Sequence, residues 1–456
     1  MGFQTIDPST GSPLAVHRPL SEAELGQALD RAGRAWRDWA MTSFDERAKH
    51  MLGLARLLRE RKRAHAELMA REMGKPLAQG EAESEKCAWV CEYYAAETAR
   101  LLADLPIPTG SGESFLAFRP LGVIFAVMPW NFPFWQVFRA AAPTLMAGNG
   151  FTLKHAPNVA GCAELIESLC REAGFPDGVF TNLPIEVELV AAAIAHPAVR
   201  GVTLTGSERA GRAVAAEAGR QLKKSILELG GSDPYIVLAD ADVAKAVELC
   251  VASRMLNAGQ VCISAKRFVV VDAVRNDFEE RLRETMAGYE MQPPLEPGAR
   301  LGPLARRDLR DTLDAQVGRS RAAGARLVLG GSTPSQPGWW YPATILLDVR
   351  PGNPAFEEEL FGPVACVVPA RDETEAMALA NASRFGLGGA IVTRDIERGR
   401  ALARDRLDVG VCAVNDFVKS DPRLPFGGIK SSGYGHELGM LGIHEFVNAK
   451  TVVIAG

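Results

Sequence analysis

Three side chains in this chain are of the types that acyl-transfer chemistry needs. Cys262 ends the segment Asn-Ala-Gly-Gln-Val-Cys, between a predicted helix and a predicted strand. Glu228 ends an apolar predicted strand, where poor solvation would raise its pKa and suit it to act as a general base. Asn131 follows another apolar strand, where its amide is a neutral donor for a developing oxyanion. Each also has an ordinary structural interpretation, as a core thiol, a surface carboxylate and a turn residue.

Gly206 and Ser207 lie where a predicted strand turns into a predicted helix. The free N–H groups and positive dipole end of such a helix form an anion site, and Gly206 would let the backbone approach a pyrophosphate. A plain helix N-cap at Ser207 is the alternative. The spacing between Gly206 and Gly211 matches that of a P-loop. However, Arg212 and Ala213 follow where a P-loop requires Lys and then Ser or Thr. Since no Gly-x-Gly-x-x-Gly follows any strand, a dinucleotide would have to bind through another phosphate device.

Composition and charge exclude several classes of protein. The 456 residues are 47% hydrophobic and 23% charged, which is ordinary for a soluble globular chain. The net charge of −4 gives no basic excess, so no nucleic-acid partner is expected. The longest apolar run, residues 121–130, is too short to span a bilayer, and the N-terminus has no apolar signal core. We therefore expect no membrane association.

The cysteines indicate a cytoplasmic protein without a metal site. There are eight, with no Cys-x-x-Cys, and their ordinary interpretation is eight reduced thiols. Cys87 and Cys91 lie four positions apart in a predicted helix, but no His or second Cys pair accompanies them.

The elements that position these residues follow from hydrophobic periodicity. Residues 21–104 read as helices, opened by a capping box at Ser21. From residue 121, short apolar runs alternate with helical segments at 20- to 30-residue spacing, which is typical of a doubly wound parallel sheet. A second α/β series starts near residue 235 and continues to about residue 416. The apolar end of the chain, residues 445–454, predicts a strand that pairs outside these sheets, and we favour an oligomer contact over a solvent-exposed edge.

Taken together, the motifs resemble those of the aldehyde dehydrogenase superfamily, in the same order and over essentially the whole chain. The similarity is carried by Pro129-Trp-Asn-Phe-Pro133, Lys154, Thr205-Gly-Ser207, Leu227-Glu-Leu-Gly-Gly231, Gly259-Gln-Val-Cys262, Glu359-Leu-Phe-Gly-Pro363 and Pro425-Phe-Gly-Gly-Ile-Lys430. Within the superfamily the chain is most similar to bacterial succinate-semialdehyde dehydrogenases, on Lys154-His-Ala-Pro-Asn-Val, Leu204-Thr-Gly-Ser-Glu, Leu229-Gly-Gly-Ser-Asp-Pro and Ala265-Lys-Arg-Phe.

The resemblance implies oxidation of an aldehyde, foremost succinate semialdehyde, to a carboxylic acid with NADP or NAD. Cys262 would attack the aldehyde, Asn131 would hold the oxyanion, and Glu228 would activate the water that hydrolyses the thioester. The implied cofactor-binding residues are Trp130, Asn131, Lys154, His155, Ala156, Pro157, Gly206, Ser207, Leu229, Glu359 and Phe361.

The family architecture implies two sheet domains and a β oligomerisation element. A cofactor-binding domain would comprise residues 1–101 and 121–230, and a catalytic domain residues 231–425. Residues 102–120 and 426–456 would form the oligomerisation element with the C-terminal strand, in a homodimer or homotetramer.

Two positions depart from the family pattern. Where relatives that prefer NAD often have Glu, this chain has Pro157, and His155 adds a candidate cation, so the preference is tilted towards NADP. An Arg found six residues before the cysteine in some relatives is Leu256 here. Arg139 matches another carboxylate-binding Arg, and a structural salt bridge is its alternative interpretation.

Three rival functions remain open: a general aldehyde dehydrogenase, a cofactor-independent thiol esterase and a catalytically silent protein.

Overall fold

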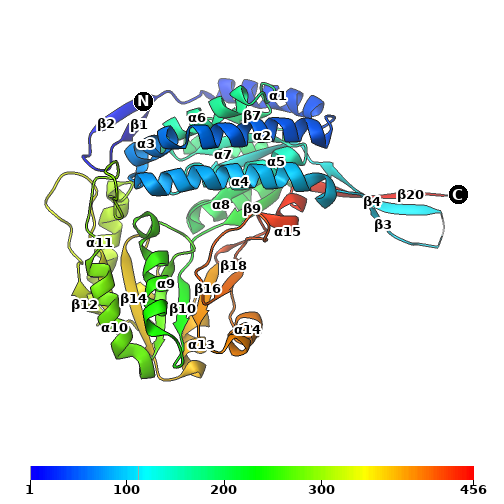
Figure 1. Ribbon diagram of the computed structural model, residues 1–456. Coiled ribbons are helices and arrows are strands. Elements are labelled where there is room, and N and C mark those ends of the chain that lie inside the picture. Colours follow the sequence, from blue (N-terminus) through cyan, green and yellow to red (C-terminus); the bar gives the residue numbers. More distant parts are fainter. Residues whose placement is uncertain (1, 111, 456) are drawn as a thin grey trace.

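The computed structural model describes residues 2–110 and 112–455, which form two α/β lobes and a projecting β arm (Figure 1). This architecture confirms the predicted α/β class with two largely parallel sheets. None of the helices in the described parts of the chain combines the length and the apolar character needed to cross a membrane.

Four helices precede the first lobe's sheet and cover it. The predicted capping box is present, because the Ser21 hydroxyl accepts from the Glu24 N–H and the Glu24 carboxylate accepts from the Ser21 N–H. The helices are α1 (Glu22–Trp39), α2 (Phe44–Glu60), α3 (Lys62–Met73) and α4 (Leu77–Leu101).

The first lobe contains a six-stranded sheet in the order β19-β9-β8-β5-β6-β7. All neighbouring pairs are parallel except β19 with β9. The central strands are buried on both faces, which explains the continuous apolar sequence of β5. The strands are β5 (Val123–Met128), β6 (Gly150–His155), β7 (Phe180–Asn182), β8 (Val199–Thr205), β9 (Lys224–Glu228) and β19 (Gly433–Tyr434). Its helices are α5 (Trp135–Met146), α6 (Ala160–Glu172), α7 (Val190–Ala195) and α8 (Glu208–Arg220).

The strand order of this sheet reverses at β5. The chain moves from β5 through β6 to β7 on one side, and then returns to β8 and β9 on the other. Ligands of open α/β sheets bind outside the carboxyl ends of the strands at such a switch point. Asn131 follows β5, and Gly206 and Ser207 follow β8, so the topology brings both predicted segments to this crevice.

The second lobe contains a seven-stranded sheet in the order β12-β13-β14-β11-β10-β16-β17. Only the β12–β13 pair is antiparallel. The strands are β10 (Asp233–Val237), β11 (Ala265–Val271), β12 (Arg326–Leu329), β13 (Thr344–Leu347), β14 (Val364–Ala370), β16 (Gly388–Val392) and β17 (Val411–Val414). Its helices are α9 (Val243–Met255), α10 (Asp272–Ala287), α11 (Arg307–Ala322), α12 (Pro354–Glu357), α13 (Glu373–Asn381) and α14 (Ile396–Asp405).

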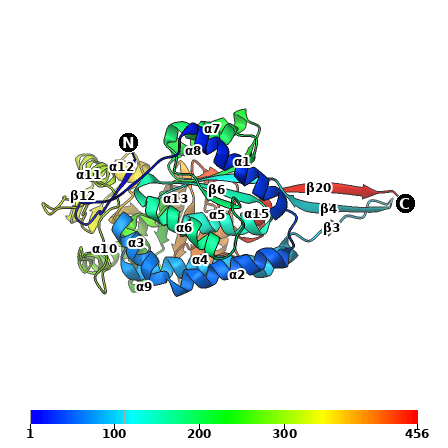
Figure 2. The same cartoon turned by 90° about the horizontal axis from the view of Figure 1, so that it is seen from above.

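The projecting arm is a three-stranded antiparallel sheet made of β3 (Leu105–Pro106), β4 (Glu113–Pro120) and β20 (Val447–Ile454). Figures 1 and 2 show this arm extending away from both lobes. The predicted C-terminal strand is therefore present, and it pairs with β4 over its whole length.

Two local features differ from the sequence-based expectations. An N-terminal hairpin of β1 (Phe3–Ile6) and β2 (Pro13–His17) was not predicted, because β2 is largely exposed and has no buried face to produce a hydrophobic pattern. The segment before β20 does not belong to the arm. Its β19 joins the first sheet, β18 (Ile429–Lys430) pairs with β15 (Phe385–Gly386), and α15 (Gly439–His444) contacts α4 and α5.

Candidate active site

Cys262 lies on a turn between α9 and β11 that begins with an unusual backbone. Asn257 and Ala258 have φ angles of 51° and 52°, and Gly259 follows at +73°. A Cβ on Gly259 would come within 2.1 Å of the Gly362 carbonyl oxygen, so only glycine fits there. Two side chains hold this turn, because the Asn257 N–H donates to Gln79 (2.8 Å) and Arg254 donates to the Gly259 carbonyl. The stretch before Cys262 is thus fixed by contacts rather than by helix or strand geometry.

Asn131 is tied directly to the Cys262 turn. Its Nδ2 atom donates to the Gln260 carbonyl oxygen across 3.0 Å, and the Asn257 side chain donates back to the Asn131 carbonyl at 2.8 Å. Asn131 is buried and shares a cavity with Cys262. Since an amide NH₂ group carries two donors, one N–H remains to meet an oxyanion at this position.

Glu228 is buried at the end of β9, with its side chain 1% exposed. Neither carboxylate oxygen has a hydrogen-bond partner among the described residues. Burial raises its pKa well above the usual value; the Arg139 charge opposes this shift and the Glu437 charge adds to it. The carboxylate of Glu228 is therefore a stronger proton acceptor than an ordinary glutamate.

Burial also raises the pKa of the Cys262 thiol, to about 12. The positive charges of Arg139 and Lys266 lower it, whereas the negative charge of Glu228 raises it. These couplings bring the predicted nucleophile and the predicted base into one electrostatic environment.

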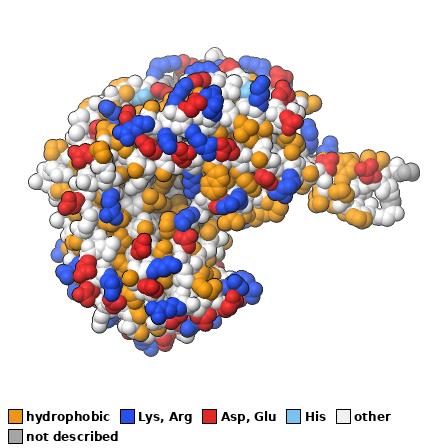
Figure 3. Space-filling view, viewed as in Figure 1, with side chains coloured by type: hydrophobic (Ala, Val, Ile, Leu, Met, Phe, Trp, Pro, Cys, Tyr) orange, Lys and Arg blue, Asp and Glu red, His pale blue; other side chains and the backbone are white. Residues whose placement is uncertain are grey.

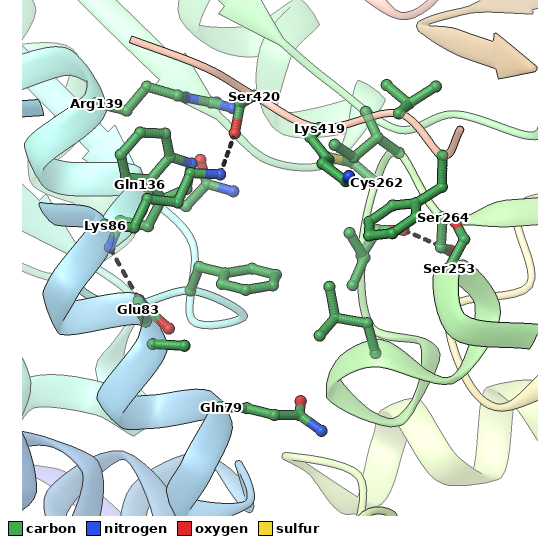
Figure 4. Close-up of a pocket in the computed structure, with 18 of the residues that line it drawn as sticks. Gln79, Glu83, Lys86, Gln136, Arg139, Ser253, Cys262, Ser264, Lys419 and Ser420 are labelled. Atoms are coloured by element: carbon green, nitrogen blue, oxygen red, sulfur yellow. Dashed lines mark hydrogen bonds between the residues drawn. The ribbon is translucent and has the colours of Figure 1, made fainter. Parts of the chain in front are cut away.

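Two cavities meet at Cys262. The first, of about 360 Å³, is shown in Figure 4, and the second has a volume of about 250 Å³. Cys262 and Gln136 line both. The second cavity is lined by seven predicted cofactor-binding residues: Trp130, Asn131, Gly206, Ser207, Leu229, Glu359 and Phe361.

Several residues that line the second cavity are of types that could contact a dinucleotide. Ser207 is the N-cap of α8, accepting from the Ala210 N–H at 3.3 Å, which confirms the N-cap interpretation, and it also lines the cavity. A Cβ added to Gly206 would meet no protein atom closer than 3.7 Å, which means that packing alone does not require glycine there. The rings of Trp130 and Phe361 lie edge to face at 5.8 Å.

The end of β6 and the residues that follow it, 154–157, do not line this second cavity. Lys154 is buried, donates to the His155 carbonyl at 3.2 Å, and has its pKa lowered by burial. Ala156 makes a backbone hydrogen bond to the ring of His155, and Pro157 lines a separate cavity of about 410 Å³.

The expectation of a cationic His155 is wrong. Its ring lies against two backbone carbonyl groups, with Nε2 at 2.8 Å from the Pro133 oxygen and Nδ1 at 3.3 Å from the Met128 oxygen. Burial lowers its pKa to about 4, so the imidazole is neutral at neutral pH. The ring therefore fixes the loop that carries Asn131 and offers no charge to a phosphate.

Arg139 also differs from its predicted role. It lines the first cavity, but its guanidinium forms a buried ion pair with Glu437, donates to the Thr205 hydroxyl at 3.2 Å, and lies over the Phe426 ring. The structural salt bridge, which was the alternative interpretation, is what the structure shows. Its charge is already balanced by a carboxylate, which corrects the expectation of a guanidinium free to bind substrate.

Sequence reasoning missed four residues of the site. Lys86 of α4 and Ser420 line the first cavity, Glu437 pairs with Arg139, and Lys266 of β11 contacts the Cys262 turn. Lys86 lies among the charged residues of α4 and carries no local signal. Lys266 lies in the Ala265-Lys-Arg-Phe segment that carries the resemblance, but its contact with the Cys262 turn was not predicted.

Comparisons with known proteins agree with this geometry. The model of the aldehyde dehydrogenase family matches residues 1–452. The chain is 45% identical to succinate semialdehyde dehydrogenase (NAD(P)+) Sad of Escherichia coli strain K12, over 98% of this chain and 97% of that protein. It is 46% identical to a probable succinate-semialdehyde dehydrogenase (NADP(+)) of Synechocystis, over the full length of both. The chain also aligns with the crystal structure of succinic semialdehyde dehydrogenase from Streptococcus pyogenes in complex with NADP+. The alignment covers 100% of each chain, with 38% sequence identity and a TM-score of 0.97.

Proposed function

The chain belongs to the aldehyde dehydrogenase family, and we propose that it oxidises succinate semialdehyde to succinate with NADP as the preferred hydride acceptor. The observation that carries this proposal is the position of Cys262 in the walls of two cavities. One cavity has space for an aldehyde, and the other is lined by the residues expected to hold a dinucleotide. A thiol between them has access to both reactants.

In this proposal Cys262 attacks the aldehyde carbon and forms a thiohemiacetal. The free N–H of Asn131 and the backbone N–H of Cys262 stabilise the oxyanion that develops. The bound nicotinamide supplies the hydride acceptor, and a thioester remains on Cys262. Glu228 then takes a proton from water, whose oxygen attacks the thioester, releasing the carboxylate and restoring the thiol.

The residue types that line the second cavity suit a dinucleotide in their chemistry. Gly206 and Ser207, at the N-terminus of α8, would hold the pyrophosphate. Trp130 and Phe361 would line the path of the nicotinamide, and Glu359 would accept hydrogen bonds from ribose hydroxyls. The absence of a glutamate at Pro157 favours NADP, since no carboxylate there repels a 2′-phosphate.

The test is the absorbance at 340 nm with NADP or NAD and a panel of aldehydes. We expect succinate semialdehyde with NADP to give the highest kcat/KM. A higher value for uncharged aldehydes would make the protein a general aldehyde dehydrogenase. Ester hydrolysis without any change at 340 nm would make it a thiol esterase.

We further propose a cytoplasmic homodimer or homotetramer. All eight cysteines are free thiols, which suits a reducing compartment. The projecting arm exposes apolar side chains, visible in Figure 3, and leaves β20 as an edge strand. The exposed apolar side chains of the arm include Leu105, which is 53% exposed, and Val453, which is 63% exposed. Light scattering should give a multiple of the 49.0 kDa chain mass.

A further inference from the structure

The first cavity is lined by three cationic side chains: Lys86, Arg139 and Lys419. Two of them are paired with carboxylates. Arg139 forms its ion pair with Glu437, and Lys419 lies 2.9 Å from Asp416 with its side chain half exposed. The third cation is therefore the one whose charge needs explanation.

Lys86 has a polar partner but no carboxylate. Its Nζ atom donates to the Ser420 hydroxyl at 2.7 Å and lies 4.3 Å from the centre of the Trp135 ring. Burial lowers the pKa of Lys86 to about 8, and the Arg139 charge adds to this effect, whereas the charges of Glu83 and Asp421 oppose it. None of the ion pairs among residues 2–110 and 112–455 includes Lys86, whose side chain is partly buried. A bound anion would stabilise an ammonium group in this position.

The nearest acidic side chain on the same helix is already occupied. Glu83 forms a buried ion pair with Lys75, and its Oε1 atom accepts from the backbone N–H groups of Phe134 and Trp135, each at 2.9 Å. This carboxylate therefore holds the start of α5. It leaves Lys86, one turn along α4, without an ion-pair partner of its own.

We propose that Lys86, together with Ser420, binds the carboxylate at the far end of the substrate. The ammonium group and the hydroxyl are two donors at one point of the cavity wall, and Figure 4 shows Cys262 across the open space from them. A four-carbon aldehyde acid has its reacting carbonyl at one end and its charge at the other, so it would place one at Cys262 and the other at Lys86. This inference rests on the proposed function and names the group that selects anionic aldehydes.

The experiment compares kcat/KM for succinate semialdehyde and for butanal, measured with NADP. Both substrates share the chemistry at Cys262, so the ratio isolates recognition of the carboxylate. Lys86→Met should lower the ratio by about tenfold or more, as expected for the loss of a charge-assisted hydrogen bond. Ser420→Ala should lower it in the same direction by less. Lys62→Met is the matched control, because it removes a lysine that lies outside both cavities and is paired with Glu85, and the ratio should stay within about threefold.

A second readout does not depend on turnover. Titration calorimetry with succinate should give binding to the unsubstituted protein that weakens about tenfold or more in Lys86→Met. An unchanged ratio and unchanged succinate affinity in Lys86→Met would overturn the assignment. A ratio near one in the unsubstituted protein would instead contradict succinate semialdehyde as the substrate, and the succinate titration would then decide the role of Lys86 by itself.

Discussion

The ammonium group of Lys266 donates a hydrogen bond of 2.6 Å to the backbone carbonyl oxygen of Cys262. The same group donates to the Val261 carbonyl at 2.9 Å and lies 3.2 Å from the Glu359 carboxylate. One buried lysine thus joins the turn that carries the nucleophile to the acidic side chain proposed to hold the cofactor. It acts on the reaction through its neighbours, as a positioning residue.

Removing this charge should make the thiol less reactive. In Lys266→Met the thiolate loses a stabilising positive charge, so the pKa of Cys262 rises further above its ordinary value. The rate of alkylation by iodoacetamide at a fixed pH should fall about tenfold, the equivalent of about one pKa unit. Lys62→Met is again the control and should alkylate at the original rate. Equal rates in both variants would show that Lys266 has no electrostatic effect on the thiol.

Cys262→Ala should abolish dehydrogenase activity and any esterase activity while the circular dichroism spectrum stays unchanged. Loss of a covalent nucleophile costs several orders of magnitude in kcat. The matched control is Cys412→Ala, since Cys412 is also partly buried and lies outside both cavities that meet at Cys262. A Cys262→Ala enzyme that kept a tenth of the turnover would contradict the assignment.

Glu228→Gln should separate the two halves of the reaction. Without a base for water, deacylation should slow far more than acylation, so stopped-flow absorbance should show one burst of reduced cofactor per active site and little steady turnover. Normal steady-state rates would refute the base role. Loss of the burst itself would indicate that Glu228 also activates Cys262.

The pH dependence of deacylation should follow the ionisation of Glu228. Only the ionised carboxylate accepts a proton, and burial raises the pKa of Glu228, so the deacylation rate should increase with pH over a range that lies above the titration range of an ordinary glutamate. Measured as single-turnover deacylation, this rising limb should be absent in Glu228→Gln. A limb that persists in the variant would have to come from another group.

Pro157→Glu should shift the ratio of kcat/KM values towards NAD by about tenfold or more. A carboxylate at this position would repel the 2′-phosphate of NADP and accept hydrogen bonds from the ribose hydroxyls of NAD. Pro157→Gln, which has the same shape without the charge, should shift the ratio much less. Unsubstituted protein that already prefers NAD more than tenfold would contradict the predicted tilt towards NADP.

The Arg139–Glu437 pair predicts a non-additive effect on stability. Removing one partner leaves a buried unpaired charge, so Arg139→Met should lower the free energy of unfolding by about 3–5 kcal/mol. The double variant Arg139→Met/Glu437→Gln should lose less than the sum of the two single variants, since it leaves no orphaned charge. Urea unfolding of all four proteins measures the coupling. Additive losses would mean that the pair contributes no interaction energy.

The sequence by itself determined the fold class and pointed to the residues proposed to react. A buried parallel strand such as β5 appears as a continuous apolar run, and the capping box of α1 needs only four consecutive residues. The positions of Cys262, Asn131 and Gly206 at the ends of elements are equally local. Features of this kind can be predicted from the sequence because they depend on residues that are neighbours along the chain.

Only the tertiary structure decided which charges are free and which are paired. Arg139 matched a carboxylate-binding position in sequence, but folding brings it against Glu437 near the other end of the chain. Lys86 looked like one more charge on an amphipathic helix, yet it reaches Ser420, 334 positions away, in the wall of the cavity. The physical reason is that the charge balance of a buried group depends on every element packed around it, and those elements are distant in sequence.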